Sequence, residues 1–199
     1  MLTLHRARLL HTGGTAIEDG AVLVDGARVA AIGPFAELAG GPARVREWPG
    51  VLVPGLLNRH GAWLLEGAYH PDPREGAGDR PLPPADGLTD EQWGGSARRG
   101  LQRLLGHGAT ALAGPFARAS VRTAVARSGL RPLAGGDTGP GPLDPLEGRE
   151  LAAALHRPLA VGGAADFVVF AAGAVEELDG GGAACLATVL DGRLLHRRR

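Results

Sequence analysis

Two β-rich segments lie at opposite ends of this 199-residue sequence. In the first, two apolar runs flank Asp25-Gly26, a pair that predicts a β-hairpin closed by a type I′ turn. In the second, Asp191-Gly192 lies between two further β-like runs. Neither segment is large enough to bury a hydrophobic core alone. We therefore expect the two ends to pack together in one small composite β-sandwich, with the middle of the chain as an insertion.

The helical part of the inserted middle begins at Thr89. Thr89 and Gln92 have the spacing of a capping box, in which each side chain accepts a hydrogen bond from a backbone N–H of the first helical turn. Gly106 and Gly108 are expected to stop this helix. Its apolar residues fall on one helical face: Trp93, Ala97, Leu101, Leu104 and Leu105.

Strands and two further helices are predicted around that helix. A buried strand lies within 51–60, short apolar strands are predicted at 109–113 and 130–134, and a second helix is predicted from about 116 to 127. This alternation of strands and helices predicts parallel strands joined by right-handed crossovers. A third helix is predicted over 144–156, since its first residues are Asp followed by Pro.

These elements predict the α+β fold class and two structural parts. Residues 1–56 and 159–199 are expected to form the composite β-sandwich, and residues 57–158 the α/β insert. The segment from 70 to 88 is rich in Pro, Gly, Asp and Arg and is predicted to be a long loop.

Composition narrows the classes of function. The formal net charge is zero, so no global field favours nucleic acid or an anionic membrane surface as a partner. No apolar run approaches the roughly 20 residues that a membrane helix needs, and the first residues lack the pattern of a signal peptide. The single cysteine, Cys185, excludes an internal disulfide framework, and a cytoplasmic location is the expectation. Every basic residue other than histidine is arginine, which excludes catalysis by lysine.

Several strings of the sequence resemble the amidohydrolase superfamily, most closely imidazolonepropionase and aminodeoxyfutalosine deaminase. Residues 20–33 look like the opening hairpin of that family, and residues 51–60 like the strand that enters its barrel. Residues 101–111 are similar to the first barrel helix and second strand. Residues 159–170 look like the return into the sandwich, and residues 191–193 like its last hairpin. The resemblance covers both ends of the chain and parts of its middle.

The sequence departs from the family at two places. In the family, the strand after the Pro-Gly pair ends in His-x-His, two imidazoles that bind one metal ion. Here the string is His60-Gly61-Ala62, and Ala62 cannot ligate a metal. The insert from about 57 to 158 is less than half of the roughly 250 residues of a (β/α)8 barrel and has room for about three barrel strands. The resemblance therefore implies a truncated barrel.

The resemblance implies roles for four residues. His60 is the candidate metal ligand, and Asp137 is similar to the eighth-strand aspartate that orients and deprotonates the metal-bound water. Tyr69 and His70 lie in the loop after the first strand, where family loops contact substrate. An alternative register makes 130–134 the third strand and places Asp137 in a loop.

Three functions follow as hypotheses. The first is a degenerate, non-catalytic amidohydrolase relative, or pseudoenzyme, that needs no cofactor, binds a partner or a small-molecule ligand, and forms a homodimer over its exposed sheet edges. The second is a hydrolase of C–N bonds in a cyclic amide or amidine, using zinc or iron held by His60 and Asp137. The third is an unrelated structural protein that shares only turn chemistry with the family.

Overall fold

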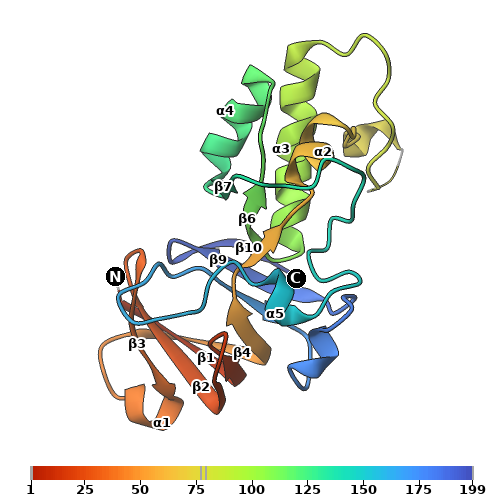
Figure 1. The fold of residues 1–199 in the computed structure, drawn as a ribbon. Coiled ribbons are helices and arrows are strands. Elements are labelled where there is room, and N and C mark those ends of the chain that lie inside the picture. Colours follow the sequence, from red (N-terminus) through yellow and green to blue (C-terminus); the bar gives the residue numbers. More distant parts are fainter. Residues whose placement is uncertain (1, 77, 79, 199) are drawn as a thin grey trace.

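The computed structural model of the chain describes residues 2–76, 78 and 80–198. Its strands form two sheets, and Figure 1 shows the larger sheet below a smaller sheet that is flanked by helices. The strands are β1 (Leu2–His11), β2 (Ala16–Asp25), β3 (Arg28–Pro34), β4 (Arg44–Pro54), β5 (Leu56–Asn58), β6 (Ala109–Ala113), β7 (Arg131–Leu133), β8 (Phe167–Phe170), β9 (Cys185–Leu190) and β10 (Arg193–Arg197). The helices are α1 (Phe35–Leu38), α2 (Gly61–Glu66), α3 (Asp90–Gly106), α4 (Ala119–Ser128) and α5 (Leu151–Ala154), with 3-10 turns η1 (Pro73–Glu75) and η2 (Glu176–Leu178).

The larger sheet combines both ends of the chain. Its seven strands lie in the order β10-β9-β8-β4-β1-β2-β3, and the antiparallel pairing of β4 with β8, Val51 opposite Phe170, joins the two ends. The mixed α+β class and the shared sheet are therefore confirmed. The ladder is continuous from one edge strand to the other, so a division into two stacked sheets stays a prediction.

One face of this sheet carries a core to which both ends of the chain contribute. Alternate residues of its strands point to the same face and pack together there. The edge strand β3 is partly covered, since the N–H of Val29 donates to the carbonyl of Gly163 (3.0 Å) and the N–H of Gly162 donates to Val29 (2.8 Å). The largest buried side chains of this core include Leu10, Leu52 and Phe167.

The two hairpins end in different turns. Asp191 and Gly192 have φ values of 48° and 70°, which is the pattern of a type I′ turn. The type I′ turn predicted at Asp25-Gly26 is wrong. Asp25 pairs with Arg28 in the ladder, so the loop is shifted by one residue, and only Gly26 in it has a positive φ.

Gly50 in β4 lies where the chain has no space for a side chain. A Cβ atom there would lie 1.8 Å from the carbonyl oxygen of Phe170 on the neighbouring strand. We expect Gly50→Ala to lower the free energy of unfolding by about 2 kcal/mol, because β4 and β8 must separate to admit the methyl group. Urea unfolding of both proteins measures this loss. Gly33→Ala is the control, since Glu37 Oε2, at 3.9 Å, is all that its Cβ would approach. Equal losses of unfolding free energy in the two variants would contradict the lack of space for a side chain at Gly50.

The smaller sheet has three parallel strands in the order β5-β6-β7. Leu56 pairs with Ala109, and Ala111 pairs with Arg131. The parallel arrangement predicted from the alternation of strands and helices is confirmed. The helices α3 and α4, in green in Figure 1, share a second hydrophobic core with β6 of this sheet.

The helix α3 follows its sequence signals closely. The capping box is present, with the N–H of Gln92 donating to Thr89 Oγ1 (3.2 Å) and the N–H of Thr89 donating to Gln92 Oε1 (2.8 Å). All five residues of the predicted apolar face are buried. The second predicted helix begins at Ala119 rather than near 116, and Gly129 ends it with a φ of 82°. No helix in the described part of the chain has the length and apolarity needed to cross a bilayer.

The helix predicted over 144–156 is wrong. Asp144 does begin a turn, since its Oδ1 accepts a hydrogen bond from the N–H of Leu146 (2.9 Å). The chain then leaves the helical path, because Gly148 has a φ of 68° and pairs with Gly180 of a distant segment (3.2 Å). Only the four residues of α5 are helical.

A buried carboxylate connects the two sheets. Asp166 precedes β8 and accepts hydrogen bonds from Arg131 Nε of β7 (2.7 Å), from Arg157 (2.6 Å) and from the N–H of Asp191 (2.8 Å). Burial alone would raise the pKa of Asp166, but these hydrogen bonds outweigh burial and hold the pKa below its usual value. One ionised side chain therefore helps to hold the insert against the larger sheet.

Candidate functional site

His60 lies directly after β5, at the point where α2 begins. Its backbone N–H donates to Asn58 Oδ1 (2.8 Å). The amide nitrogen of Asn58 in turn donates to the carbonyls of Pro142 (3.0 Å) and Leu143 (3.1 Å). Asn58 is buried, so this end of β5 and the 142–143 segment are held together by an amide that is shielded from water.

Asp137 is brought to His60 by the backbone of the loop after β7. The N–H of Asp137 donates to the carbonyl of Arg59 (2.8 Å), and the N–H of Gly136 donates to the carbonyl of Gly114 (3.1 Å). His60 Nε2 then lies 3.7 Å from Asp137 Oδ2. The structure agrees with the alternative register: β7 is the third strand of the insert, and Asp137 lies in the loop after it. Among the described residues, the insert has no strand after β7.

Arg149 completes this cluster, and sequence reasoning missed it. One guanidinium nitrogen, NH2, lies 3.3 Å from His60 Nε2 and 3.5 Å from Asp137 Oδ2. Arg149 falls inside the segment that was predicted to be a helix. No local signal could have identified its role, because its position depends on the turn before it and on the distant Gly180.

The His60 ring is enclosed. A Cβ on Gly141 would lie 2.1 Å from Cγ of that ring, so the loop passes directly over it. His60 Nδ1 lies 3.4 Å from the carbonyl oxygen of Gly139, and Nε2 faces the guanidinium of Arg149. This pattern assigns the ring hydrogen to Nδ1 and the acceptor role to Nε2. The imidazole side chain is 15% exposed.

The donors at this cluster do not fit a metal ion. A catalytic zinc site needs about three protein ligands, and His60 and Asp137 supply two. Ala62 lies on α2, not on a strand beside His60. The guanidinium of Arg149 contacts both donors and carries the positive charge that a metal would supply. Across residues 2–76, 78 and 80–198, no group of three His, Cys, Asp or Glu side chains could hold a metal.

Tyr69 and His70 lie in a different group of contacts, between α2 and α3. His70 is buried; its Nε2 donates to the carbonyl of Leu64 (2.8 Å), and its backbone N–H donates to Ser96 Oγ (2.8 Å). The hydroxyl of Tyr69 donates to Glu75 Oε1 (2.9 Å). Burial lowers the pKa of His70 to about 4. The structure thus brings His60 and Asp137 together, whereas His70 fastens the long loop to the helices. A substrate role for Tyr69 and His70 stays a prediction.

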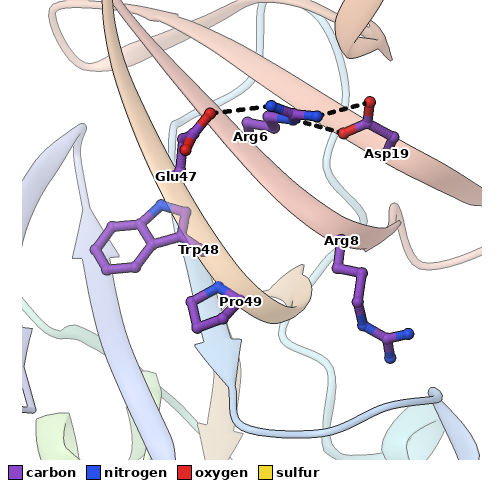
Figure 2. A pocket seen from close by; sticks show the side chains of 6 residues that line it. All are labelled: Arg6, Arg8, Asp19, Glu47, Trp48 and Pro49. Atoms are coloured by element: carbon purple, nitrogen blue, oxygen red, sulfur yellow. Dashed lines mark hydrogen bonds and ion pairs between the residues drawn. The ribbon is translucent and has the colours of Figure 1, made fainter.

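A hollow of about 500 Å³ lies on the larger sheet (Figure 2). Arg6 donates from Nε to Asp19 (2.6 Å) and from NH1 to Glu47 (2.9 Å), so its charge is already neutralised. Figure 2 shows Arg8 pointing away from this group, and Arg8 donates to the carbonyl of Gly173. We assign no chemistry to this hollow, because Arg6 is paired with both carboxylates and Arg8 already donates to a backbone carbonyl. It is lined by Arg6, Arg8, Asp19, Glu47, Trp48 and Pro49.

Comparison with known proteins finds distant likenesses of fold. No family model matches the sequence, and no curated protein matches it. An adenosine deaminase from Xanthomonas campestris is similar over 66% of this chain and 33% of its own, at 22% identity and a TM-score of 0.48. Helicobacter pylori aminofutalosine deaminase is similar over 67% and 33%, at 14% identity and a TM-score of 0.46. An amidohydrolase from a Sargasso Sea sample is similar over 67% and 33%, at 22% identity and a TM-score of 0.45.

This chain therefore spans about a third of the length of each of these three solved structures. An aminofutalosine deaminase and an amidohydrolase are thus among the solved structures that resemble this chain, and these are the kinds of protein that the sequence strings resemble. Activity, substrate and partner do not follow from likenesses at these identities and TM-scores.

Proposed function

We propose that this chain is a degenerate, non-catalytic relative of the amidohydrolases, most like imidazolonepropionase, and that it acts as a binding or partner protein. The observation that carries the proposal is the position of Arg149. Its guanidinium contacts the two residues, His60 and Asp137, whose counterparts in the family serve a metal ion.

Charge is the first support for this proposal. A guanidinium within 3.5 Å of both donors repels a divalent cation, and arginine stays charged at every pH of interest. His60 and Asp137 are also held in place without a metal, since Asn58 fixes the first and the carbonyl of Arg59 fixes the second. The positions of His60 and Asp137 are therefore fixed by protein contacts alone.

The size of the insert is the second support. A (β/α)8 barrel has eight parallel strands, and this insert contributes β5, β6 and β7. The catalytic groups of such barrels come from the ends of several strands, so a truncated barrel lacks most of the positions that a family active site uses.

Two other functions are alternatives to this proposal. A metal-dependent hydrolase of cyclic amides or amidines would use His60 and Asp137, which lie 3.7 Å apart, together with zinc or iron ligands from a second chain. An unrelated structural protein would not need the ends of the chain to share a sheet, which they do. A homodimer and a small-molecule ligand belong to our proposal and stay predictions.

Metal analysis tests the proposal. Protein purified without chelators is expected to contain far less than one zinc or iron per chain. It is expected to show no metal-dependent turnover of imidazolone-like or aminopurine-nucleoside-like substrates. Arg149→Ala is expected to bind zinc at least about tenfold more tightly than the unaltered protein, because a fixed positive charge beside both donors is removed. Isothermal titration with zinc measures the difference.

The result that would overturn the proposal is equally definite. Stoichiometric zinc or iron in the unaltered protein, lost in His60→Ala, would establish a working metal site. Arg44→Ala is the control for the arginine substitution, because Arg44 is an exposed residue at the start of β4, on the larger sheet rather than in the insert. Equal zinc affinity in Arg149→Ala and Arg44→Ala would show that the guanidinium of Arg149 does not block the site.

A further inference from the structure

A second cavity lies between η1 and the exposed side of α3. Its volume is about 430 Å³, within the range of small-molecule pockets. It shares no lining residue with the cluster at His60. The residues that line it are Asp72, Pro73, Gly95, Arg98, Arg99, Gln102 and Arg103.

The floor of this cavity is a glycine inside a helix. A Cβ atom on Gly95 would lie 3.5 Å from NH1 of Arg99 and 3.8 Å from NH2 of Arg98, and it would approach no other group within 4 Å. Glycine is disfavoured in a helix interior relative to alanine. Packing does not require it here, since no backbone or core side chain occupies the space. The missing side chain leaves an open position flanked by two guanidinium groups.

The two guanidinium groups differ in how firmly they are held. Arg99 donates from Nε to the carbonyl of His70 (2.7 Å) and lies over the ring of Tyr69, 5.7 Å from its centroid. Arg98 is exposed, and among the described residues it has no hydrogen bond or ion pair. One guanidinium is therefore pre-positioned, and the other has its donors available to a ligand.

The charge of the lining favours an anion. Arg98 and Arg99 flank the open position, and the one carboxylate of the lining, Asp72, lies 3.7 Å from NH1 of Arg99 and accepts the N–H of Arg74 (3.0 Å). A phosphate monoester is anionic and carries three strong acceptor oxygens, so it can accept hydrogen bonds from both guanidinium groups at once, which a carboxylate with two oxygens does less well. Guanidinium groups also bind phosphate through two parallel hydrogen bonds.

We propose that this cavity binds the phosphate group of a small phosphorylated molecule, between Arg98 and Arg99 and over Gly95. The Asp72 carboxylate repels the phosphate and faces the rest of the ligand, where it accepts hydrogen bonds from hydroxyl groups. The remaining volume of the cavity holds that part of the molecule. This inference goes beyond the proposed function and does not depend on the cluster at His60.

Titration of the full chain with glycerol 3-phosphate, measured by isothermal calorimetry, tests the inference. A second titration measures competition by inorganic phosphate. Saturable binding is expected, with glycerol showing none. Arg98→Gln is expected to weaken the affinity about tenfold, because one charge-assisted pair of hydrogen bonds is lost. Arg127→Gln on α4 removes the same charge outside the cavity lining and is expected to leave the affinity unchanged.

A substitution at the floor separates binding from folding. Gly95→Glu places a carboxylate three residues before Arg98 and four before Arg99, the spacings at which helical ion pairs form. This variant is expected to unfold at a higher urea concentration than the unaltered protein and to lose phosphate binding. Gly95→Gln, its neutral isostere, also fills the open position but adds no negative charge, and it is expected to weaken binding less than Gly95→Glu does. Equal affinities in Arg98→Gln and Arg127→Gln, or no saturable binding, would overturn the inference without affecting the metal test at His60.

Discussion

Asp166→Asn is expected to lower the free energy of unfolding by about 3 kcal/mol. The carboxylate side chain is 2% exposed and accepts from Arg131, from Arg157 and from the backbone of Asp191. Asparagine keeps the shape and one acceptor but removes the charge, so two guanidinium groups lose their partner. Because Arg131 belongs to β7 and Asp166 directly precedes β8 of the larger sheet, the loss weakens the attachment of the insert.

Thermal and urea unfolding measure this effect, and a loss of 3 kcal/mol corresponds to a fall in Tm of about 6–12 °C for a chain of this size. Asp19→Asn is the matched control, because Asp19 also pairs with an arginine, Arg6, but its side chain is 53% exposed. It is expected to cost at most about 1 kcal/mol. Equal losses at the two positions would show that burial of the Asp166 network contributes nothing.

Acid is expected to destabilise the fold between about pH 6.5 and pH 4 through His5 and His70. Burial lowers the pKa of both to about 4, helped by Arg46 at the first and by Arg103 at the second. The unfolded chain binds protons at the ordinary pKa near 6.5, whereas the folded chain does not. Stability is therefore full above pH 6.5 and decreases as the pH falls, by on the order of 2 kcal/mol per histidine at pH 4.5.

Urea unfolding at intervals from pH 7.5 to pH 4.5 measures this slope. His5→Gln is expected to reduce it, while His70 and the less buried His156 and His196, whose pKa values are also lowered, supply the remainder. The network at Asp166 provides an internal control. Its carboxyl has a lowered pKa, so its contribution is present above the ordinary value of 3.8 and is lost only at lower pH. Asp166→Asn should therefore show the same slope in this window as the unaltered protein. A flat profile would contradict the burial of both imidazoles.

Local signals predicted the helix α3 and the hairpin strands well, but not the helix expected over 144–156. The start of α3 at Thr89 followed from a capping box, and its buried face followed from helical periodicity, because both depend on residues within a few positions of each other. The hairpin around Asp25 and Gly26 was correct, but its turn type was not. The register of β2 against β3 moved the loop by one residue, and register is a property of the whole sheet.

The candidate site was predictable only in part. His60 and Asp137 were chosen because their strings resemble a known family, and the structure places them 3.7 Å apart. Arg149 was not predicted, although it contacts both of them. Its position depends on the turn at Gly148 and on pairing with Gly180, so a residue more than 30 positions away decides where its side chain lies.

The sequence by itself determined the α+β class, the strands at both ends, the capped helix at Thr89 and the absence of a second imidazole at Ala62. Each of these depends on residue type or on short-range periodicity. Only the tertiary structure decided that one carboxylate, Asp166, joins the two sheets and that Arg149 lies between His60 and Asp137. The physical reason is that ion pairs act between side chains that chain folding brings together, and no local pattern records which distant cation will reach a given carboxylate.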